Sequence, residues 1–259
     1  MRTSPDLRAL AQGAADVLVR LRAKPPRVHC ITNPVAQNFT ANVLLAVGAQ
    51  PSMTISPEEI GHFAAGADAL LVNLGTFDRE RAEAIDIAIA AATAAKRPWV
   101  LDPVLIDRSP PRAALARELL KRRPAALRLN AAEFAVLADK QSPAEFAAAH
   151  STVVALSGAA DIVASAEQAA ALANGHPLMA RITAMGCAGS ALVAACLAVE
   201  KDPWLASVTG VLMLGVAGET AGEVWKGPGS FAVAILDALY HLEPGALAAK
   251  AQISAKVAQ

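Results

Sequence analysis

Residues 181–195 read RITAMGCAGSALVAA and place a cysteine among small residues at a predicted helix start. We expect a short apolar strand end, a turn at 184–186 and a helix that opens at Cys187. The unpaired N–H groups and the positive dipole end of a helix start bind anions such as phosphate. A cysteine at this position is expected to have a lowered pKa and an available thiolate. The alternative is that Cys187 is a small apolar residue packed in an alanine-rich helix.

Two carboxylates fall at predicted boundaries between elements. Asp102 ends a buried strand, and Glu133 lies in the first turn of a helix. Phosphoryl transfer uses Mg²⁺ to neutralise phosphate charge, and Mg²⁺ prefers a few carboxylates with several waters, which suits both residues. Alternatively, Asp102 is a cap or turn residue and Glu133 a glutamate favoured by the helix dipole. Arg112 is a candidate phosphate partner or, alternatively, part of a solvated helix face.

Composition and missing motifs narrow the classes of function. The sequence has no GxxxxGK[ST], which excludes a P-loop enzyme, and no GxGxxG after its first strand, which disfavours a Rossmann dehydrogenase. Lys plus Arg and Asp plus Glu number 23 each, so charge gives no case for nucleic acid or an anionic membrane. Three cysteines without CxxC spacing disfavour a disulfide framework or a structural zinc site and fit a reducing compartment.

Two segments bear on localisation. The N-terminal residues MRTSPDLRALAQ lack a continuous apolar core, so we expect no signal peptide. The apolar run 203–218 is too short and too rich in small residues for a membrane span, and we interpret it as a core helix. We therefore expect a cytoplasmic protein.

Predicted strands alternate with helices along almost the whole chain. Apolar runs predict strands at 27–32, 52–54, 69–73, 99–102, 126–129 and 152–156, with helices between them. Helix starts are predicted at Ser4 and Pro5 and at capping boxes in 56–59 and 142–145. Residues 161–165, with a turn at Asn174 and Gly175, predict an antiparallel edge hairpin.

This alternation predicts an α/β fold with a mostly parallel central sheet and helices on both faces. No linker or shift in composition divides the chain, so we expect a single domain over residues 1–259. In such sheets, ligands bind at the carboxyl ends of the strands. The positions just after predicted strand ends are Asn33, Met53, Asn73, Asp102, Asn130, Ser157 and the turn 184–187.

Seven motifs, in order, carry a resemblance to a known family. They are VHCITNPVAQNFTANVLLAVGAQPSM (28–53), ALLVNLGT (69–76), VLDPV (100–104), LRLNAAE (127–133), NGHPLM (174–179), ITAMGCAGSALVAA (182–195) and KGPGSF (226–231). Together they resemble hydroxyethylthiazole kinases of the ribokinase-like superfamily. The resemblance implies a ribokinase-like three-layer α/β/α fold. It also implies ATP-dependent phosphorylation of the hydroxyethyl group of 4-methyl-5-(2-hydroxyethyl)thiazole in thiamine salvage, with Mg²⁺ as the second cofactor.

The resemblance assigns residues to the acceptor side of the site. It implies that Met53 and Ala184 line the thiazole site, with Asn33 nearby. Cys187 falls where most members of the superfamily place a catalytic aspartate, and Gly186 with the helix start would form the anion hole. The resemblance further implies a homotrimer, in which Met53 of one chain faces Cys187 of the next.

The resemblance also assigns residues to the nucleotide side. It implies that Arg112, Ser157 and Asn130 contact ATP. Asn130 and Glu133 match the N-x-x-E element of the family, and Asp102 matches the aspartate of its LDPV motif. Both carboxylates would therefore belong with Mg²⁺ and phosphate.

Two departures from the family pattern leave rival functions open. Ala184 stands where many relatives have glycine, and Ser157-Gly158-Ala159 lacks the glutamate of their TGE. A non-catalytic homologue that binds thiazole or nucleotide is the alternative that these departures support. Another is a different vitamin-precursor kinase of the same superfamily, such as one acting on hydroxymethylpyrimidine, for which an aspartate is expected at position 187.

Overall fold

The computed structural model describes residues 6–224 and 226–255. Within them lies one sheet with the strand order β2-β1-β3-β4-β5-β6-β7-β8-β9. The strands are β1 (Arg27–Ile31), β2 (Gln50–Ser52), β3 (Ala69–Asn73), β4 (Trp99–Asp102), β5 (Ala126–Asn130), β6 (Val153–Ser157), β7 (Asp161–Ala164), β8 (Ala169–Leu172) and β9 (Ile253–Ala255). Neighbouring strands from β2 to β6 are parallel, and those from β6 to β9 are antiparallel. The predicted mostly parallel sheet is confirmed.

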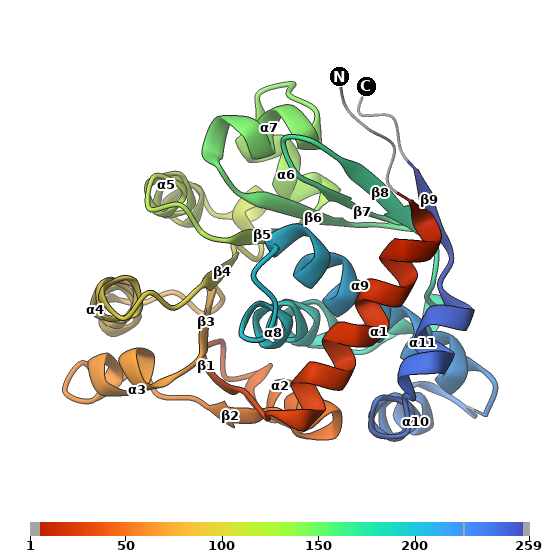
Figure 1. Cartoon of the computed structure of the whole chain (residues 1–259). Coiled ribbons are helices and arrows are strands. Elements are labelled where there is room, and N and C mark those ends of the chain that lie inside the picture. Colours follow the sequence, from red (N-terminus) through yellow and green to blue (C-terminus); the bar gives the residue numbers. More distant parts are fainter. Residues whose placement is uncertain (1–5, 225, 256–259) are drawn as a thin grey trace.

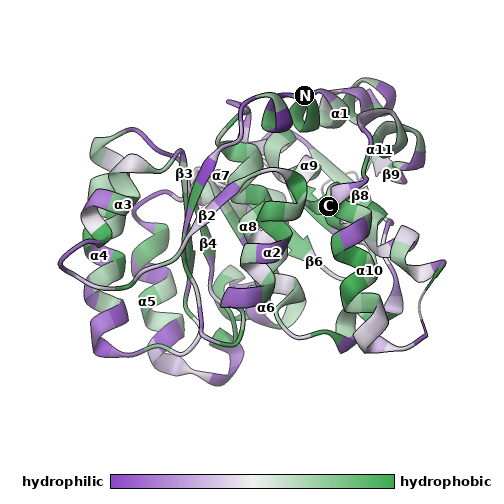
Figure 2. Ribbon diagram, turned by 90° about the horizontal axis from the view of Figure 1, so that it is seen from below, coloured by the Kyte–Doolittle hydropathy of each residue, from purple (hydrophilic) through white to green (hydrophobic). Residues whose placement is uncertain are grey.

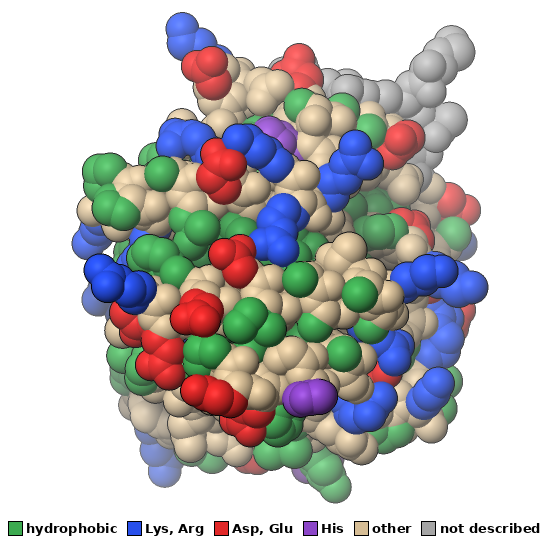
Figure 3. Space-filling view, turned by 90° about the vertical axis from the view of Figure 1, so that its left-hand side faces the viewer, with side chains coloured by type: hydrophobic (Ala, Val, Ile, Leu, Met, Phe, Trp, Pro, Cys, Tyr) green, Lys and Arg blue, Asp and Glu red, His purple; other side chains and the backbone are tan. Residues whose placement is uncertain are grey.

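Helices cover both faces of this sheet and complete three layers (Figure 1). One face carries α1 (Leu7–Ala23), α2 (Gln37–Val47), α8 (Met185–Leu197), α9 (Pro203–Gly222), α10 (Pro228–Tyr240) and α11 (Pro244–Lys250). The other face carries α3 (Ile60–Gly66), α4 (Arg79–Ala94), α5 (Pro110–Leu120), α6 (Ala131–Ala138) and α7 (Pro143–His150). Two short 3-10 helices, η1 (Ile106–Arg108) and η2 (Pro177–Arg181), lie in connections. Over α3 to α5 the outer surface mixes both signs of charge (Figure 3).

The central strands are apolar on both sides because each face of the sheet is covered. Successive residues alternate between two core clusters. Cys30 and Leu71 belong to the cluster under α8 and α9, whereas Ile31 and Val72 belong to the cluster under α4 and α5. Hydrophobic residues predominate in α8 and α9 (Figure 2). Because alternate residues are buried on opposite faces, these strands form nearly continuous apolar runs in the sequence.

Helices α8 and α9 pack almost backbone to backbone. A Cβ on Gly210 would lie 2.7 Å from the backbone nitrogen of Val193, so only glycine permits this approach. By length and composition α9 could cross a membrane, but 78% of its most apolar window is buried inside the structure. The prediction that residues 203–218 form a core helix is confirmed by that burial.

Some helix starts differ from the prediction. The predicted start at Ser4 and Pro5 lies outside the described residues, and α1 begins at Leu7 with Asp6 as its cap. The capping box predicted in 56–59 is wrong. These residues form a turn, α3 begins only at Ile60, and the Glu59 carboxylate accepts a bond from Thr54 instead. The capping box in 142–145 is confirmed at the start of α7.

Two local predictions after β6 also need correction. The antiparallel hairpin exists as β7 and β8, but it turns at 165–168 because the Ser165 hydroxyl accepts the backbone N–H groups of Glu167 and Gln168. Asn174 and Gly175 follow β8 and lead into η2. The strand predicted just before residue 184 is absent. Its apolar residue Ile182 instead packs against the core from the loop after η2.

Candidate active site

A cavity of about 290 Å³ lies at the carboxyl edge of the parallel strands. Its walls come from the ends of β4, β5 and β6, from the loop after η2 and from the start of α8. The predicted site residues that line it are Asp102, Asn130, Glu133, Ser157, Ala184, Gly186 and Cys187. The rule that ligands bind at the carboxyl ends of parallel strands therefore selected a real concavity here.

Helix α8 begins in this wall, two residues before the predicted start. Its cap, Ala184, has φ +68° and ψ −1°, a left-handed conformation that costs a non-glycine residue on the order of 1 kcal/mol. The first hydrogen bond of the helix is donated by the N–H of Ala188 to the carbonyl oxygen of Ala184, with an N···O distance of 2.8 Å. The N–H groups of Met185, Gly186 and Cys187 therefore have no acceptor within the helix, and all three residues line the cavity. This geometry suits an anion.

Cys187 is buried at the third position of α8, with 7% of its surface exposed. Its Sγ lies 3.3 Å from Nδ2 of Asn73 and 3.6 Å from Nδ2 of Asn33. Burial, with a further contribution from the Asp102 charge, raises the pKa of the thiol to about 12. The expectation of a lowered pKa is wrong, because loss of water outweighs the amide hydrogen bonds and the positive charge of Arg128. The side chain is a neutral thiol at physiological pH.

Asp102 ends β4 and is 5% exposed. Its Oδ2 accepts hydrogen bonds from Nδ2 of Asn73 at 2.7 Å and from Oγ of Ser190 at 3.0 Å. Burial raises the pKa of Asp102, although Arg128 and these hydrogen bonds oppose the change. Asn73 thus contacts both Asp102 and Cys187 and ties β4 to the start of α8.

Arg128 is the charged residue of this site that sequence reasoning missed. It lies on β5, is 8% exposed, and its Nη1 donates a 2.8 Å hydrogen bond to the carbonyl of Gly186. The guanidinium lies against α8 so closely that a Cβ on Gly189 would be 2.9 Å from Cζ. An arginine inside an otherwise apolar strand was the available signal, because a buried charge needs a partner.

Glu133 and Asn130 form a reciprocal capping box at the start of α6. Oδ1 of Asn130 accepts the N–H of Glu133 at 3.0 Å, and Oε2 of Glu133 accepts the N–H of Asn130 at 2.9 Å. The other carboxylate oxygen accepts the N–H of Leu105 at 2.7 Å. Burial raises the pKa of Glu133, and the charges of Asp102 and Asp107 add to that rise. Glu133 therefore has the structural role that the sequence offered as an alternative, that of a carboxylate in the first turn of a helix.

Of the remaining predicted residues, some lie at the cavity or beside Cys187 and others do not. Asn33 is brought to Cys187, and Ser157 lines the cavity while its Oγ donates to the carbonyl of Leu129 at 3.2 Å. Arg112 does not line it, and its Nη1 donates to the carbonyl of Val104 at 3.3 Å. Met53, just past β2, packs against the core cluster under α8 and α9 and does not line the cavity either.

The departure at Ala159 leaves no glutamate there, but a carboxylate is close by. Asp161 accepts the N–H of Gly158 at 2.8 Å. Burial raises the pKa of Asp161, while the charge of Arg128 opposes the rise. A carboxylate and Arg128 thus interact beside this turn.

The donor set fits Mg²⁺ bound together with a nucleotide better than a metal held by protein alone. Among the described residues, no three His, Cys, Asp or Glu side chains come together as ligands. Mg²⁺ usually keeps several waters and binds one or two carboxylates plus substrate phosphates. Asp102 and Glu133 are two buried carboxylates on the cavity wall whose raised pKa values a nearby cation would lower.

Comparisons with known proteins identify the family of this chain. The sequence matches the family described as the hydroxyethylthiazole kinase family over residues 18–145 and 141–245. It is 45% identical to the hydroxyethylthiazole kinase of Klebsiella pneumoniae, covering 85% of this chain and 92% of that protein. The structure resembles the hydroxyethylthiazole kinase protein of Pyrococcus horikoshii, with TM-score 0.90, 34% identity, and coverage of 93% of this chain and 98% of the other.

A more distant match concerns the fold alone. Pyridoxal kinase of Staphylococcus aureus, solved with AMP-PCP and pyridoxal, matches with TM-score 0.57 and 15% identity over 76% of this chain and 89% of that one. The ribokinase-like three-layer fold is confirmed by these neighbours. With family matches that span most of its length, the chain belongs to the hydroxyethylthiazole kinase family.

Proposed function

We propose that this chain transfers the γ-phosphoryl group of ATP to the hydroxyl of 4-methyl-5-(2-hydroxyethyl)thiazole. Membership of the kinase family gives the reaction class. The observation that carries the site assignment is the start of α8, where three N–H groups without helical acceptors meet buried Arg128, Asp102 and Cys187 at one cavity. The chain would act as a single domain, which its continuous nine-stranded sheet supports, and in the cytoplasm.

The phosphoryl group would bind at the helix start. The N–H groups of Met185, Gly186 and Cys187 supply donors, and preorganised donors of this kind stabilise charge that develops in a transition state. Arg128 holds the Gly186 carbonyl and brings a positive charge beside the same turn. Ser157 and Asn130, on the neighbouring wall, are placed to contact the nucleotide. Mg²⁺ bound through water to Asp102 and Glu133 would neutralise phosphate charge.

Cys187 would position the acceptor hydroxyl rather than act as a preformed thiolate. Its neutral thiol lies between the amides of Asn33 and Asn73, which fix the sulfur at the cavity wall. Phosphoryl transfer passes through a loose transition state that depends mainly on positioning and charge stabilisation. Late in the reaction the thiol would relay the hydroxyl proton, taking it up as its own S–H proton passes to an oxygen of the transferred phosphoryl group.

The acceptor side of the site would be completed by a neighbouring chain in a homotrimer. Met53 does not line the cavity of its own chain. Exposed apolar side chains lie at Val35 and Leu45, before and within the helix α2 that contacts β2; they are 67% and 57% exposed. In the proposed trimer these side chains would be covered by the neighbouring chain, as contiguous apolar surface at an interaction site is. A methionine from another subunit would adapt readily to the edge of a heterocycle.

A mixing experiment tests the shared site. One chain carries Met53→Arg and another carries Cys187→Ala, and each alone should fold and have almost no activity. Co-refolding should restore a sizeable fraction of activity if Met53 of one chain serves Cys187 of the next. Mixing restores nothing if both residues serve one site within a chain, and a monomer by mass measurement in solution would contradict the trimer directly.

The main test is ATP consumption with the thiazole alcohol as acceptor. Turnover that depends on the thiazole and on Mg²⁺ is expected. Turnover with hydroxymethylpyrimidine instead would favour the other vitamin-precursor kinase. Binding of thiazole or nucleotide without turnover would favour a non-catalytic homologue, the alternative to which the strained Ala184 and the missing glutamate at Ala159 point.

A further inference from the structure

Met53 lies in a segment that regular secondary structure does not secure. Strand β2 ends at Ser52, and residues 53–56 belong to neither helix nor strand. In the part of the chain that the structure describes, β2 is the edge strand of the sheet and pairs with β1 over three residue pairs. Something other than the backbone ladder must therefore fix the position of Met53.

His29 supplies that constraint from the neighbouring strand. It lies on β1 directly opposite Ser52 in the register and is 0% exposed. Its Nδ1 is 2.8 Å from Oγ of Ser52, and its Nε2 is 3.2 Å from the carbonyl oxygen of Thr54. Because a carbonyl only accepts, Nε2 carries the proton and Nδ1 accepts from the Ser52 hydroxyl. One imidazole thus holds the residues on both sides of Met53.

The surroundings of His29 keep the ring in this neutral form. The ring of Phe63, on α3, lies with its centroid 5.5 Å away. Burial lowers the pKa of His29, although the hydrogen bond to Thr54 and the charge of Glu59 oppose that change. Glu59 is itself engaged, since its Oε1 accepts from Oγ1 of Thr54 at 2.6 Å. A neutral ring has one donor, which the Thr54 carbonyl requires, and one acceptor, which the Ser52 hydroxyl can satisfy.

The two bonds also set the direction of the Met53 side chain. His29 faces the side of α3, as its contact with Phe63 shows, and the Met53 side chain packs on the opposite side of the sheet, against the cluster under α8 and α9. Successive residues of an extended chain point to opposite sides. With the Ser52 side chain fixed toward α3 by His29, Met53 lies on the opposite side, and the bond to the Thr54 carbonyl holds the backbone just past it.

We propose that His29 is a positioning residue for Met53 and sets the affinity of the enzyme for the acceptor alcohol without touching it. This inference rests on the proposed function, because it takes Met53 as part of the thiazole site. It holds whether Met53 serves its own chain or a neighbouring one. The contacts of His29 among the described residues go to Ser52, Thr54 and Phe63, none of which lies on the nucleotide side, where Asn130 and Ser157 line the cavity.

The test compares KM values for the two substrates in variants of the full chain. His29→Phe keeps an aromatic ring but removes both hydrogen bonds, and should raise KM for the thiazole alcohol about 10-fold with KM for ATP within about two-fold. His29→Gln, which can remake one bond, should recover part of that loss. Ser52→Ala removes only the hydroxyl and should give a smaller rise. Thr209→Val, which deletes a buried hydroxyl bonded within α9, is the matched control and should change neither KM.

Each outcome is decisive. Equal changes in both KM values in His29→Phe, or no change, would overturn the inference while wild-type turnover leaves the proposed function standing. Wild type without turnover would overturn both. Hydrogen exchange gives a readout independent of activity, since the amides of residues 53–56 should exchange faster in His29→Phe than in Thr209→Val. Equal protection in the two variants would also contradict the proposal.

Discussion

The two edges of the central sheet carry cavities of opposite character. The cavity at the carboxyl edge has a volume of about 290 Å³, and its charged residues Asp102, Arg128 and Glu133 are each less than 10% exposed. The cavity at the amino edge is larger, about 760 Å³, and holds more charged residues. They are Arg20, Lys24, Lys96, Arg97, Lys201, Asp68 and Glu200.

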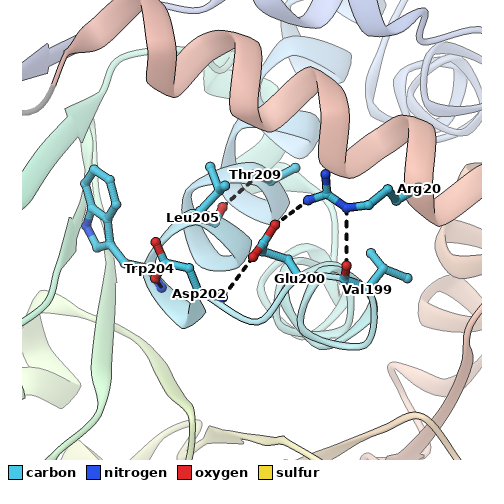
Figure 4. Close-up of polar contacts among 7 residues, drawn as sticks. All are labelled: Arg20, Val199, Glu200, Asp202, Trp204, Leu205 and Thr209. Atoms are coloured by element: carbon cyan, nitrogen blue, oxygen red, sulfur yellow. Dashed lines mark hydrogen bonds and ion pairs between the residues drawn. The ribbon is translucent and has the colours of Figure 1, made fainter.

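The charged side chains at the amino edge are more exposed to water, and they form contacts that hold neighbouring elements together. Arg20 of α1 reaches over the link between α8 and α9, where it pairs with Glu200 and donates to the carbonyl of Val199 (Figure 4). The Arg20 and Glu200 side chains are 44% and 17% exposed. Helices α1, α4 and α8 all end around this cavity, at Ala23, Ala94 and Leu197. Basic residues there offset the negative ends of the helix dipoles.

The difference shows that cavity volume and number of charges do not identify the reactive edge. At the carboxyl edge a helix begins, its positive end faces the cavity, and the charged groups are buried and held by directional hydrogen bonds. At the amino edge α1, α4 and α8 end beside the cations, and the start of α9 at Pro203, which also lines this cavity, is capped by the Asp202 carboxylate. Catalysis by charge stabilisation needs the first arrangement.

The largest expected effect comes from Arg128. Arg128→Met should lower kcat/KM for ATP by about 10²–10³-fold, because a preorganised donor and positive charge leave the phosphate site. Arg112→Met is the comparison variant and should have a smaller effect, since Arg112 does not itself line the cavity and donates to the carbonyl of Val104 on the cavity wall. A larger loss in Arg112→Met than in Arg128→Met would support the sequence-based assignment of Arg112 to ATP.

A smaller effect is expected at Cys187. Cys187→Ala should lower kcat about 10²-fold, as removal of a positioned acid–base group does. Cys187→Asp should keep substantial activity, because a carboxylate is the usual group at this position in the superfamily. Since the pKa of the thiol is about 12, Cys187→Ala should change the height of the pH–rate profile and not its shape below about pH 9. Wild-type kcat in Cys187→Ala would reduce the cysteine to a packing residue.

The Mg²⁺ dependence comes next in size. Glu133→Gln should raise the Mg²⁺ concentration needed for half-maximal rate about 10-fold, as loss of a supporting carboxylate does. Glu145→Gln, in the corresponding capping box of α7, is the control because it makes the same local change away from the cavity. Identical Mg²⁺ titrations for the two variants would count against the metal role of Glu133.

The smallest effect is expected at the amino edge. Glu200→Gln should change the free energy of unfolding by about 0–1 kcal/mol, because partly exposed ion pairs contribute little. Urea denaturation measures that change, and kcat and both KM values should stay at wild-type levels. A kinetic defect in this variant would break the contrast between the two edges.

Local patterns in the sequence determined the alternation of elements, the mostly parallel sheet and the cap of α7. Period-two burial and the Ser142 capping box involve residues close together in the chain, so their signals survive without tertiary information. The carboxyl-edge rule then selected Asp102, Ser157 and Cys187 by position alone. The family resemblance supplied the reaction.

Long-range contacts decided the rest. The Asn73–Cys187 and Ser190–Asp102 contacts join residues 114 and 88 positions apart, and Arg128 meets Gly186 across 58 positions. The sign of the Cys187 pKa change depended on burial among these groups, which a motif does not contain. Packing also determines that Arg112 does not line the cavity and that His29 is hydrogen-bonded to Ser52. Strand register and helix placement determine which side chains come into contact.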